Sequence, residues 1–286
     1  SYRHFIRKAK RLGIPSVLVK HEPPAVIPEH RETNPGDLFD KVITRGVASN
    51  TPIFKVDTVW DTRFTSRHQR VQRIVAITAD KWSFYPSELY SLRRQAYATD
   101  SRIDLFGHGW EQTNWRRLIR LTKEMILVLR LGILPKVTNL EFAFAPPRNH
   151  LGSTGDKHAV LSKYQVSLVI ENDISAMSEK LVDCILAGTI PVYVGPKVSN
   201  FGIPDDLVVE SEPNLVAVLE SIDLALEMDY IAFRERASAW AMLESAKESW
   251  NSRRIGESLL NHAVENYLPH SKRSNSVSYT HLTLPT

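Results

Sequence analysis

The stretch that decides the fold begins with Tyr164-Gln-Val-Ser-Leu-Val-Ile-Glu-Asn-Asp173 and continues, after a short polar loop, with Ser178-Glu-Lys-Leu-Val-Asp-Cys-Ile-Leu-Ala-Gly188 and Thr189-Ile-Pro-Val-Tyr-Val-Gly-Pro196. The first segment is aliphatic and β-branched, which is typical of a strand buried on both faces. The second has a helical period, with Ser178 as its predicted N-cap and Gly188 at its end. The third predicts another strand with a proline near its start. Together they predict a strand–loop–helix–strand unit of a parallel sheet.

Polar residues collect at one end of these elements. Asn172 follows the first strand, and Glu179 and Lys180 open the helix. Ligands of parallel sheets bind beyond the carboxyl ends of the strands. A carboxylate there can accept both hydroxyls of a ribose, a lysine can neutralise a diphosphate, and the first N–H groups of a helix favour anions. These residues predict a nucleotide-sugar site, although Glu-Lys alone is also an ordinary start of a surface helix.

The same stretch resembles the donor-binding segment of glycosyltransferase family 10, the α1,3/4-fucosyltransferases. The matching elements are Ile170-Glu171-Asn172, Glu179-Lys180, Ala187-Gly-Thr-Ile-Pro-Val192 and Gly195-Pro196. With fewer matches the resemblance extends over residues 17–209, where Arg102-Ile-Asp-Leu-Phe-Gly107 is similar to a strand end of the family. It implies that Arg93 or Arg94 contacts the donor diphosphate, and Arg94 fits the family spacing slightly better.

A second match lies near the start of the chain. Val17-Leu-Val-Lys-His-Glu-Pro-Pro24 resembles the strand that ends in Glu-Ser-Pro in the family, where the glutamate is the general base. The resemblance implies that Glu22 takes the proton of an acceptor hydroxyl as this hydroxyl attacks the anomeric carbon. Pro23 favours an extended conformation at Glu22. His21 could share this role or bind the acceptor.

The expected fold class is α/β, a GT-B type glycosyltransferase with two Rossmann-like domains, the N-terminal one truncated. We expect part of an acceptor-side domain over 1–68, a nucleotide-sugar-binding domain over 69–269, and a disordered or non-native tail over 270–286. The last stretch of this tail, residues 277–285, looks like a translated cloning or sequencing adapter. The alternation of the remaining segments by itself favours an α/β fold with a parallel sheet, and the GT-B type is what the resemblance implies. Strands are expected over 16–19, 39–44, 73–78 and 102–106, helices over 2–11, 89–97, 115–131, 213–228 and 229–250, and a closing segment over 255–267.

The resemblance implies an inverting, metal-independent transfer of fucose from GDP-fucose to a hydroxyl of an oligosaccharide or glycolipid, in surface glycan or lipopolysaccharide assembly, without a cofactor. The loop between Asn172 and Glu179 is about two residues shorter than in the family, and Ala176 replaces an aromatic residue. A transferase that uses another nucleotide sugar is therefore one alternative. A catalytically inactive carbohydrate-binding protein is the second.

Composition limits the remaining function classes. The chain has 286 residues, of which 43% are hydrophobic and 24% charged, and a formal net charge of +4, which is too small to argue for nucleic-acid binding. One cysteine, Cys184, excludes an internal disulfide and fits a reducing compartment. No apolar run reaches the roughly 18 residues of a membrane span. Metal-binding motifs such as Asp-x-Asp or His-x-x-x-His are missing. We expect a cytoplasmic protein, with peripheral association at the inner face of a membrane left open and the oligomeric state undetermined.

Overall fold

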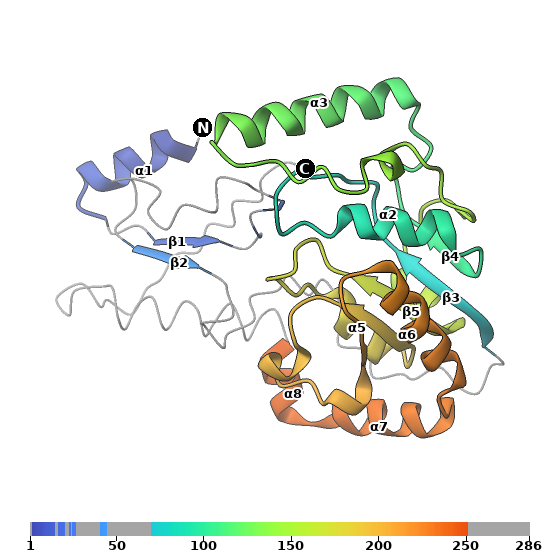
Figure 1. Cartoon of the computed structure of the whole chain (residues 1–286). Coiled ribbons are helices and arrows are strands. Elements are labelled where there is room, and N and C mark those ends of the chain that lie inside the picture. Colours follow the sequence, from blue (N-terminus) through green and yellow to red (C-terminus); the bar gives the residue numbers. More distant parts are fainter. Residues whose placement is uncertain are drawn as a thin grey trace.

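The computed structural model describes residues 2–14, 17–20, 23, 25–26, 41–44 and 70–250. Over these ranges the chain is an α/β protein with parallel sheets, as predicted (Figure 1). The strands are β1 (Val17–Lys20), β2 (Lys41–Thr44), β3 (Val71–Ile77), β4 (Ile103–Phe106), β5 (Tyr164–Ile170), β6 (Ile190–Val194) and β7 (Val209–Glu210). The α-helices are α1 (Tyr2–Arg11), α2 (Tyr90–Thr99), α3 (Asn114–Arg130), α4 (Lys157–Leu161), α5 (Lys180–Leu186), α6 (Leu215–Glu227), α7 (Tyr230–Met242) and α8 (Glu244–Trp250).

The larger sheet has the strand order β4-β3-β5-β6-β7, and all its neighbouring strands are parallel. β1 and β2 form a separate parallel pair. From β3 the chain moves outward to β4, and from β5 it moves in the opposite direction to β6 and β7. The order therefore reverses between β3 and β5, and such a reversal opens a crevice at the carboxyl ends of the two strands.

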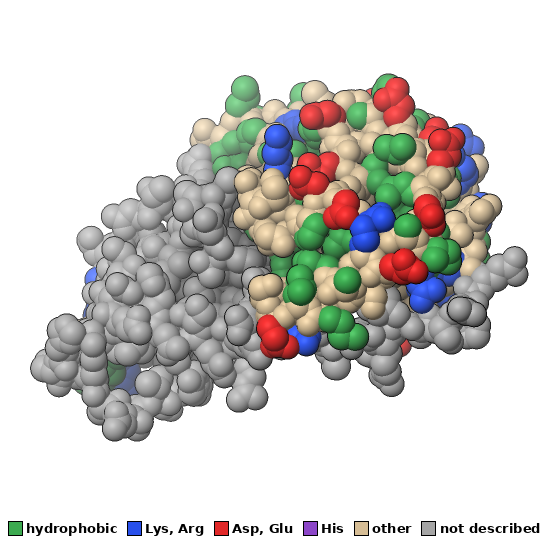
Figure 2. Space-filling view, turned by 90° about the horizontal axis from the view of Figure 1, so that it is seen from below, with side chains coloured by type: hydrophobic (Ala, Val, Ile, Leu, Met, Phe, Trp, Pro, Cys, Tyr) green, Lys and Arg blue, Asp and Glu red, His purple; other side chains and the backbone are tan. Residues whose placement is uncertain are grey.

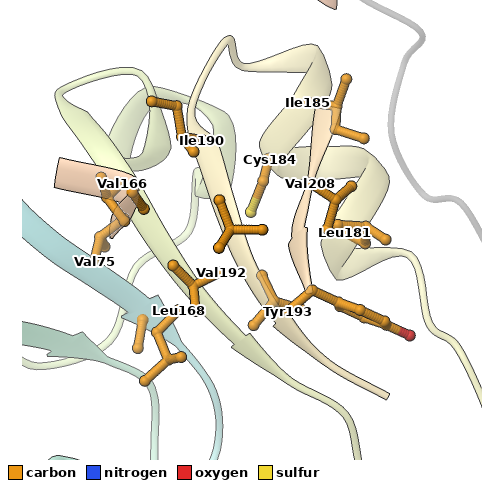
Figure 3. Close-up of a cluster of buried hydrophobic side chains, with 14 of the residues drawn as sticks. Val75, Val166, Leu168, Leu181, Cys184, Ile185, Ile190, Val192, Tyr193 and Val208 are labelled. Carbon is orange, nitrogen blue, oxygen red and sulfur yellow. The ribbon is translucent and has the colours of Figure 1, made fainter. Parts of the chain in front are cut away.

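The centre of this sheet is apolar, as the sequence of β5 and β6 predicts. The two strands pair from Val166 with Ile190 to Ile170 with Val194, and every residue of β6 is buried. Figure 3 shows side chains of both strands packed with those of α5. Ser167 is a polar residue in this layer, and its hydroxyl donates to the Val75 carbonyl at 3.0 Å. The core therefore encloses no unsatisfied hydroxyl at this position.

Helices cover both faces of the sheet, which explains why its strands carry apolar residues on both sides. α2 and α6 pack on each other and on β5, whereas α4, α5 and α7 pack together on the opposite face. α5 is followed by Gly188 with φ of 66°, the left-handed conformation that was predicted for this position. The loop before α5 connects two buried elements, β5 and α5.

Some elements differ from expectation. The helix predicted over 229–250 is divided at Leu243, whose ψ of 131° is extended. α4 and β7 were not predicted, because each is very short. The helical period of α3 places Leu118 in a row with Leu121 and Val128, which are buried, yet Leu118 is 45% exposed. The segment 255–267 and the predicted domain boundary at residues 68 and 69 lie outside the described residues. No helix of the described ranges has the length and apolarity needed to cross a membrane.

Candidate functional site

Four of the five predicted donor residues lie around the carboxyl end of β5, next to β3: Arg93, Asn172, Glu179 and Lys180. A cavity of about 40 Å³ lies there, lined by Thr78 after β3, Leu168 of β5, and Lys180 and Asp183 of α5. This space suffices for a few water molecules. The cavity is therefore too small to enclose a nucleotide.

A buried carboxylate organises the loop between β5 and α5. Glu171 is 1% exposed and accepts hydrogen bonds from the backbone N–H of Ser178 at 2.7 Å and from its hydroxyl at 2.6 Å. The ammonium of Lys180 lies 3.5 Å from the same carboxylate. Gly195 approaches so closely that an added Cβ would lie 2.9 Å from Cγ of Glu171. Glu171 was part of the sequence match, but its positioning role was not predicted.

The predicted N-cap role of Ser178 is wrong. Its hydroxyl donates to Glu171 instead of accepting from the helix, and Glu179 occupies the cap position without a side-chain cap bond. Glu171 is a buried carboxylate and therefore a strong acceptor of hydrogen bonds, so it determines the direction in which the Ser178 hydroxyl points. Such a contact between residues seven apart in a loop leaves no periodic signal in the sequence.

Glu179 and Lys180 lie at the solvent-accessible side of this loop, with side chains 29% and 21% exposed. The ammonium of Lys157 lies 3.4 Å from the Glu179 carboxylate. Burial by itself raises the pKa of Glu179, but the positive charges of Lys180 and Lys157 outweigh it and hold this pKa below its ordinary value. Glu179 is therefore ionised at neutral pH and can accept hydrogen bonds.

Arg93 and Asn172 form the other half of the candidate site. One terminal nitrogen of Arg93 donates to Oδ1 of Asn172 at 3.0 Å and to the Ile170 carbonyl at 2.5 Å. The guanidinium stacks on Tyr90, 5.0 Å from the ring centroid, and the residue is 3% exposed. Within the described ranges, no carboxylate lies at ion-pair distance from Arg93. The structure therefore places a buried positive charge beside Asn172.

Arg94, the other candidate, belongs to a different cluster. It is 2% exposed and forms an ion pair with buried Asp80, which Arg117 and Arg120 also approach, at 3.6 and 3.1 Å. Its guanidinium also lies 4.8 Å from the ring centroid of Trp110. Neighbouring residues on α2 thus point to separate partners, a distinction that spacing alone could not make. Arg94 has a carboxylate partner and Arg93 has none among the described residues.

The beginning of the chain reaches this edge through Asp173. This residue is fully buried and accepts from the hydroxyl of Ser87 at 2.5 Å, the backbone N–H of Ser175 at 2.8 Å and the backbone N–H of Ala25 at 3.3 Å. Ala25 stands three residues after Glu22. Glu22 and His21 themselves lie outside the described residues, so their predicted roles stay predictions.

Over the part of the chain that the structure describes, no group of three or more His, Cys, Asp or Glu side chains is arranged to hold a metal ion. The cations at the sheet edge belong to Arg93, Lys157 and Lys180. The arrangement can thus hold an anionic group near Arg93 and Lys180 and a hydroxyl-bearing group near Glu179.

Comparison with known proteins gives neighbours at the level of fold. No family model matches the sequence, and no curated protein matches it. A glycosyltransferase from Rickettsia africae ESF-5 has a TM-score of 0.50 at 11% identity, over 95% of this chain and 81% of that one. An α1,3-fucosyltransferase with GDP-fucose has a TM-score of 0.42 at 14% identity, over 90% and 76% of the two chains. An α1,3-fucosyltransferase with GDP has a TM-score of 0.37 at 16% identity, over 70% of this chain and 48% of that one.

This chain therefore spans about half the length of the α1,3-fucosyltransferase in its GDP complex. The similarity to the Rickettsia africae protein concerns the fold alone, because only 11% of the aligned residues are identical.

Proposed function

We propose that the protein is a glycosyltransferase that moves a sugar from a nucleotide-sugar donor to a hydroxyl of an oligosaccharide or glycolipid, with GDP-fucose as the donor. The observation that carries the proposal is the convergence of Arg93, Asn172, Glu179 and Lys180 on the end of β5. Arg93 contacts residues 170 and 172, and Lys180 contacts the residue between them. Arg93 and Lys180 thus each contact the segment that follows β5, beside the reversal of strand order, and α/β proteins bind nucleotides at such a reversal.

Each of these side chains suits one part of the donor. The ammonium of Lys180 and the guanidinium of Arg93 offset the charge of the diphosphate, which grows as the sugar leaves. Arg93 replaces Arg94 in this role because Arg94 is already paired with Asp80. Asn172 orients Arg93 through its side-chain oxygen. Glu179, whose carboxylate is kept ionised by Lys180 and Lys157, accepts hydrogen bonds from the ribose hydroxyls.

The proposed reaction is a single displacement with inversion at the anomeric carbon. Glu22 removes the proton of the acceptor hydroxyl, the oxygen bonds to the sugar, and GDP leaves with the electron pair of the broken bond. The bond between Ala25 and Asp173 supports this role, since it holds the segment just after Glu22 beside the donor edge. No metal takes part, because the two cations neutralise the leaving group.

The choice of guanine as the nucleobase and of fucose as the sugar follows from the resemblance to family 10. A transferase that uses another nucleotide sugar is the first alternative, because the loop between Asn172 and Glu179, which would cover the nucleobase of the donor, is shorter than in the family. An inactive carbohydrate-binding protein is the third possibility. Titration with GDP, UDP and ADP distinguishes the three. Selectivity for GDP together with hydrolysis of GDP-fucose supports the proposal, and selectivity for another nucleobase supports a different nucleotide sugar. Absence of nucleotide binding supports the inactive carbohydrate-binding protein.

The decisive variant is Lys180→Ala, measured by calorimetric titration of GDP in excess chelator. A charge-assisted hydrogen bond contributes about 1.5–3 kcal/mol, so we expect GDP affinity to fall by about tenfold or more. Lys163→Ala is the matched control, because Lys163 is exposed and stands at the opposite end of β5. Equal affinity in the two variants would exclude the assigned phosphate contact. Binding that disappears in chelator and returns with Mn²⁺ would exclude the metal-independent class.

A further inference from the structure

The outer face of α3 is apolar. The large apolar side chains that it exposes are Trp115 (68%), Leu118 (45%), Ile119 (41%), Ile126 (43%) and Leu129 (55%). Trp115, Ile119, Ile126 and Leu129 are separated by four, seven and three residues, so they lie in one row along the helix. We call these five residues the outer face of α3. An apolar row of this size on a surface helix indicates a site of interaction with another protein or with a membrane.

The fold does not need this face, because α3 is attached through its other side. Leu121 and Val128 pack with Trp82 and Phe84 in a small cluster that is separate from the core of the sheet. Next to it, Arg120 donates to the Asp80 carbonyl at 2.7 Å. Substitutions on the outer face should therefore leave the fold intact.

One flank of the outer face is basic. Arg116, Lys123 and Arg130 are exposed and stand seven residues apart, so they form a second row parallel to the apolar one. The only acidic residue of α3, Glu124, is partly buried on the attached side. The face thus combines aromatic and aliphatic side chains with positive charge and presents no acidic group of its own helix.

We propose that the outer face of α3 binds an anionic lipid surface, with the helix axis parallel to the bilayer. The apolar side chains would enter the boundary between headgroups and acyl chains, while Arg116, Lys123 and Arg130 pair with lipid phosphates. Trp115 has the amphipathic ring that favours this interface. Figure 1 shows α3 along the outer edge of the described part of the molecule.

The charge pattern favours lipid over a second copy of the chain. A second α3 would bring another basic flank and no exposed acid to pair with it. The face seen in Figure 2, away from α3, offers no comparable surface, because basic, acidic and apolar side chains are interspersed there. The complementary charge is therefore supplied by anionic headgroups.

The test is co-sedimentation of the whole chain with vesicles of phosphatidylcholine containing about one third phosphatidylserine, and with pure phosphatidylcholine vesicles. We expect binding to the first and little to the second, with loss at high salt, because salt screens the attraction to the surface. Arg116→Gln/Lys123→Gln/Arg130→Gln should weaken binding on the order of a hundredfold, since each basic residue near an anionic surface contributes about fivefold. Trp115→Ser/Leu129→Ser should weaken it by more than about tenfold.

The matched control is Val216→Ser/Ile231→Ser, which removes apolar side chains that are 65% and 61% exposed on α6 and α7. It should bind vesicles like the wild type, and thermal melting of every variant checks that the fold is retained. The proposal is overturned if the wild type stays in the supernatant, or if the α3 variants sediment like the control. It is also overturned if light scattering without vesicles shows an oligomer that Trp115→Ser/Leu129→Ser dissociates, because the face would then serve a protein contact.

Discussion

Glu179 and Lys180 are neighbours in the chain, yet their surroundings suit them to different parts of a nucleotide. Lys180 has three N–H donors, of which two are directed to Glu171 and to the hydroxyl of Ser178, at 3.5 and 3.0 Å. A third donor is left for a phosphate oxygen. Glu179 can only accept when ionised, so it suits hydroxyl groups and not phosphates. Their partners, and not their sequence order, separate the two tasks.

This division of tasks predicts how each residue responds to a change in the ribose. Wild-type protein should bind GDP about tenfold or more tightly than 2′-deoxy-GDP, because the deoxy compound lacks one hydroxyl that Glu179 accepts. Glu179→Ala should weaken GDP binding and bind the two nucleotides with equal affinity. Lys180→Ala should weaken binding of both nucleotides and keep the preference. Calorimetric titration of the two nucleotides against the three proteins measures all six affinities.

Opposite behaviour would reassign the two residues. If Lys180→Ala abolishes the preference for GDP while Glu179→Ala keeps it, the ribose lies near Lys180 and the proposed orientation of the donor is reversed. Thermal melting provides the control for folding, since both side chains are partly exposed and neither fills the core.

At the scale of elements, the regular parts of the unit were predictable and the contacts between them were not. β5 and β6 follow from their β-branched residues, and the end of α5 follows from Gly188, because each depends on local chemistry. The orientation of Ser178 depends on Glu171, which directly follows β5. Similarly, α3 was predicted from its period, but Leu118 lies on its exposed side, because a helix that is apolar on two sides gives no unique packed face.

The attachment of α3 depends on Asp80, which makes a further prediction. Asp80 is buried and lies at the centre of Arg94, Arg117 and Arg120. Asp80→Asn would leave three guanidinium groups without their carboxylate, and removing one partner of a buried ion pair costs about 3–5 kcal/mol. We expect a decrease of this order in the free energy of unfolding, measured by urea denaturation.

Asp206→Asn is the matched control for this substitution. Asp206 forms an ion pair with Arg236 at 3.1 Å, but its side chain is 59% exposed. An exposed pair contributes only about 0–1 kcal/mol. A loss of stability in Asp80→Asn no larger than in Asp206→Asn would show that the arginine cluster does not depend on its central carboxylate.

At the scale of the whole molecule, the described strands form two parallel sheets. β1 and β2 form one, and the five strands after residue 70 form the other. The hydrogen bond from Ala25 to Asp173 joins the segment after β1 to the end of β5. A transferase of the proposed kind needs this arrangement, because the base and the donor-binding residues must come from separate parts of the chain and meet at one place.

This arrangement predicts that Glu22 affects turnover and not donor binding. Glu22→Gln keeps the shape of the side chain but cannot accept the proton of the acceptor hydroxyl. Transfer of fucose from GDP-fucose to a saccharide should therefore fall by about 10²-fold or more. GDP affinity should stay at the wild-type value, because the proposed donor residues Arg93, Asn172, Glu179 and Lys180 all lie after residue 70. Near-normal turnover in Glu22→Gln would move the role of the base to His21 or Glu29. A parallel loss of GDP affinity and of thermal stability would instead show that Glu22 supports the fold, and the chemical role assigned to it would be wrong.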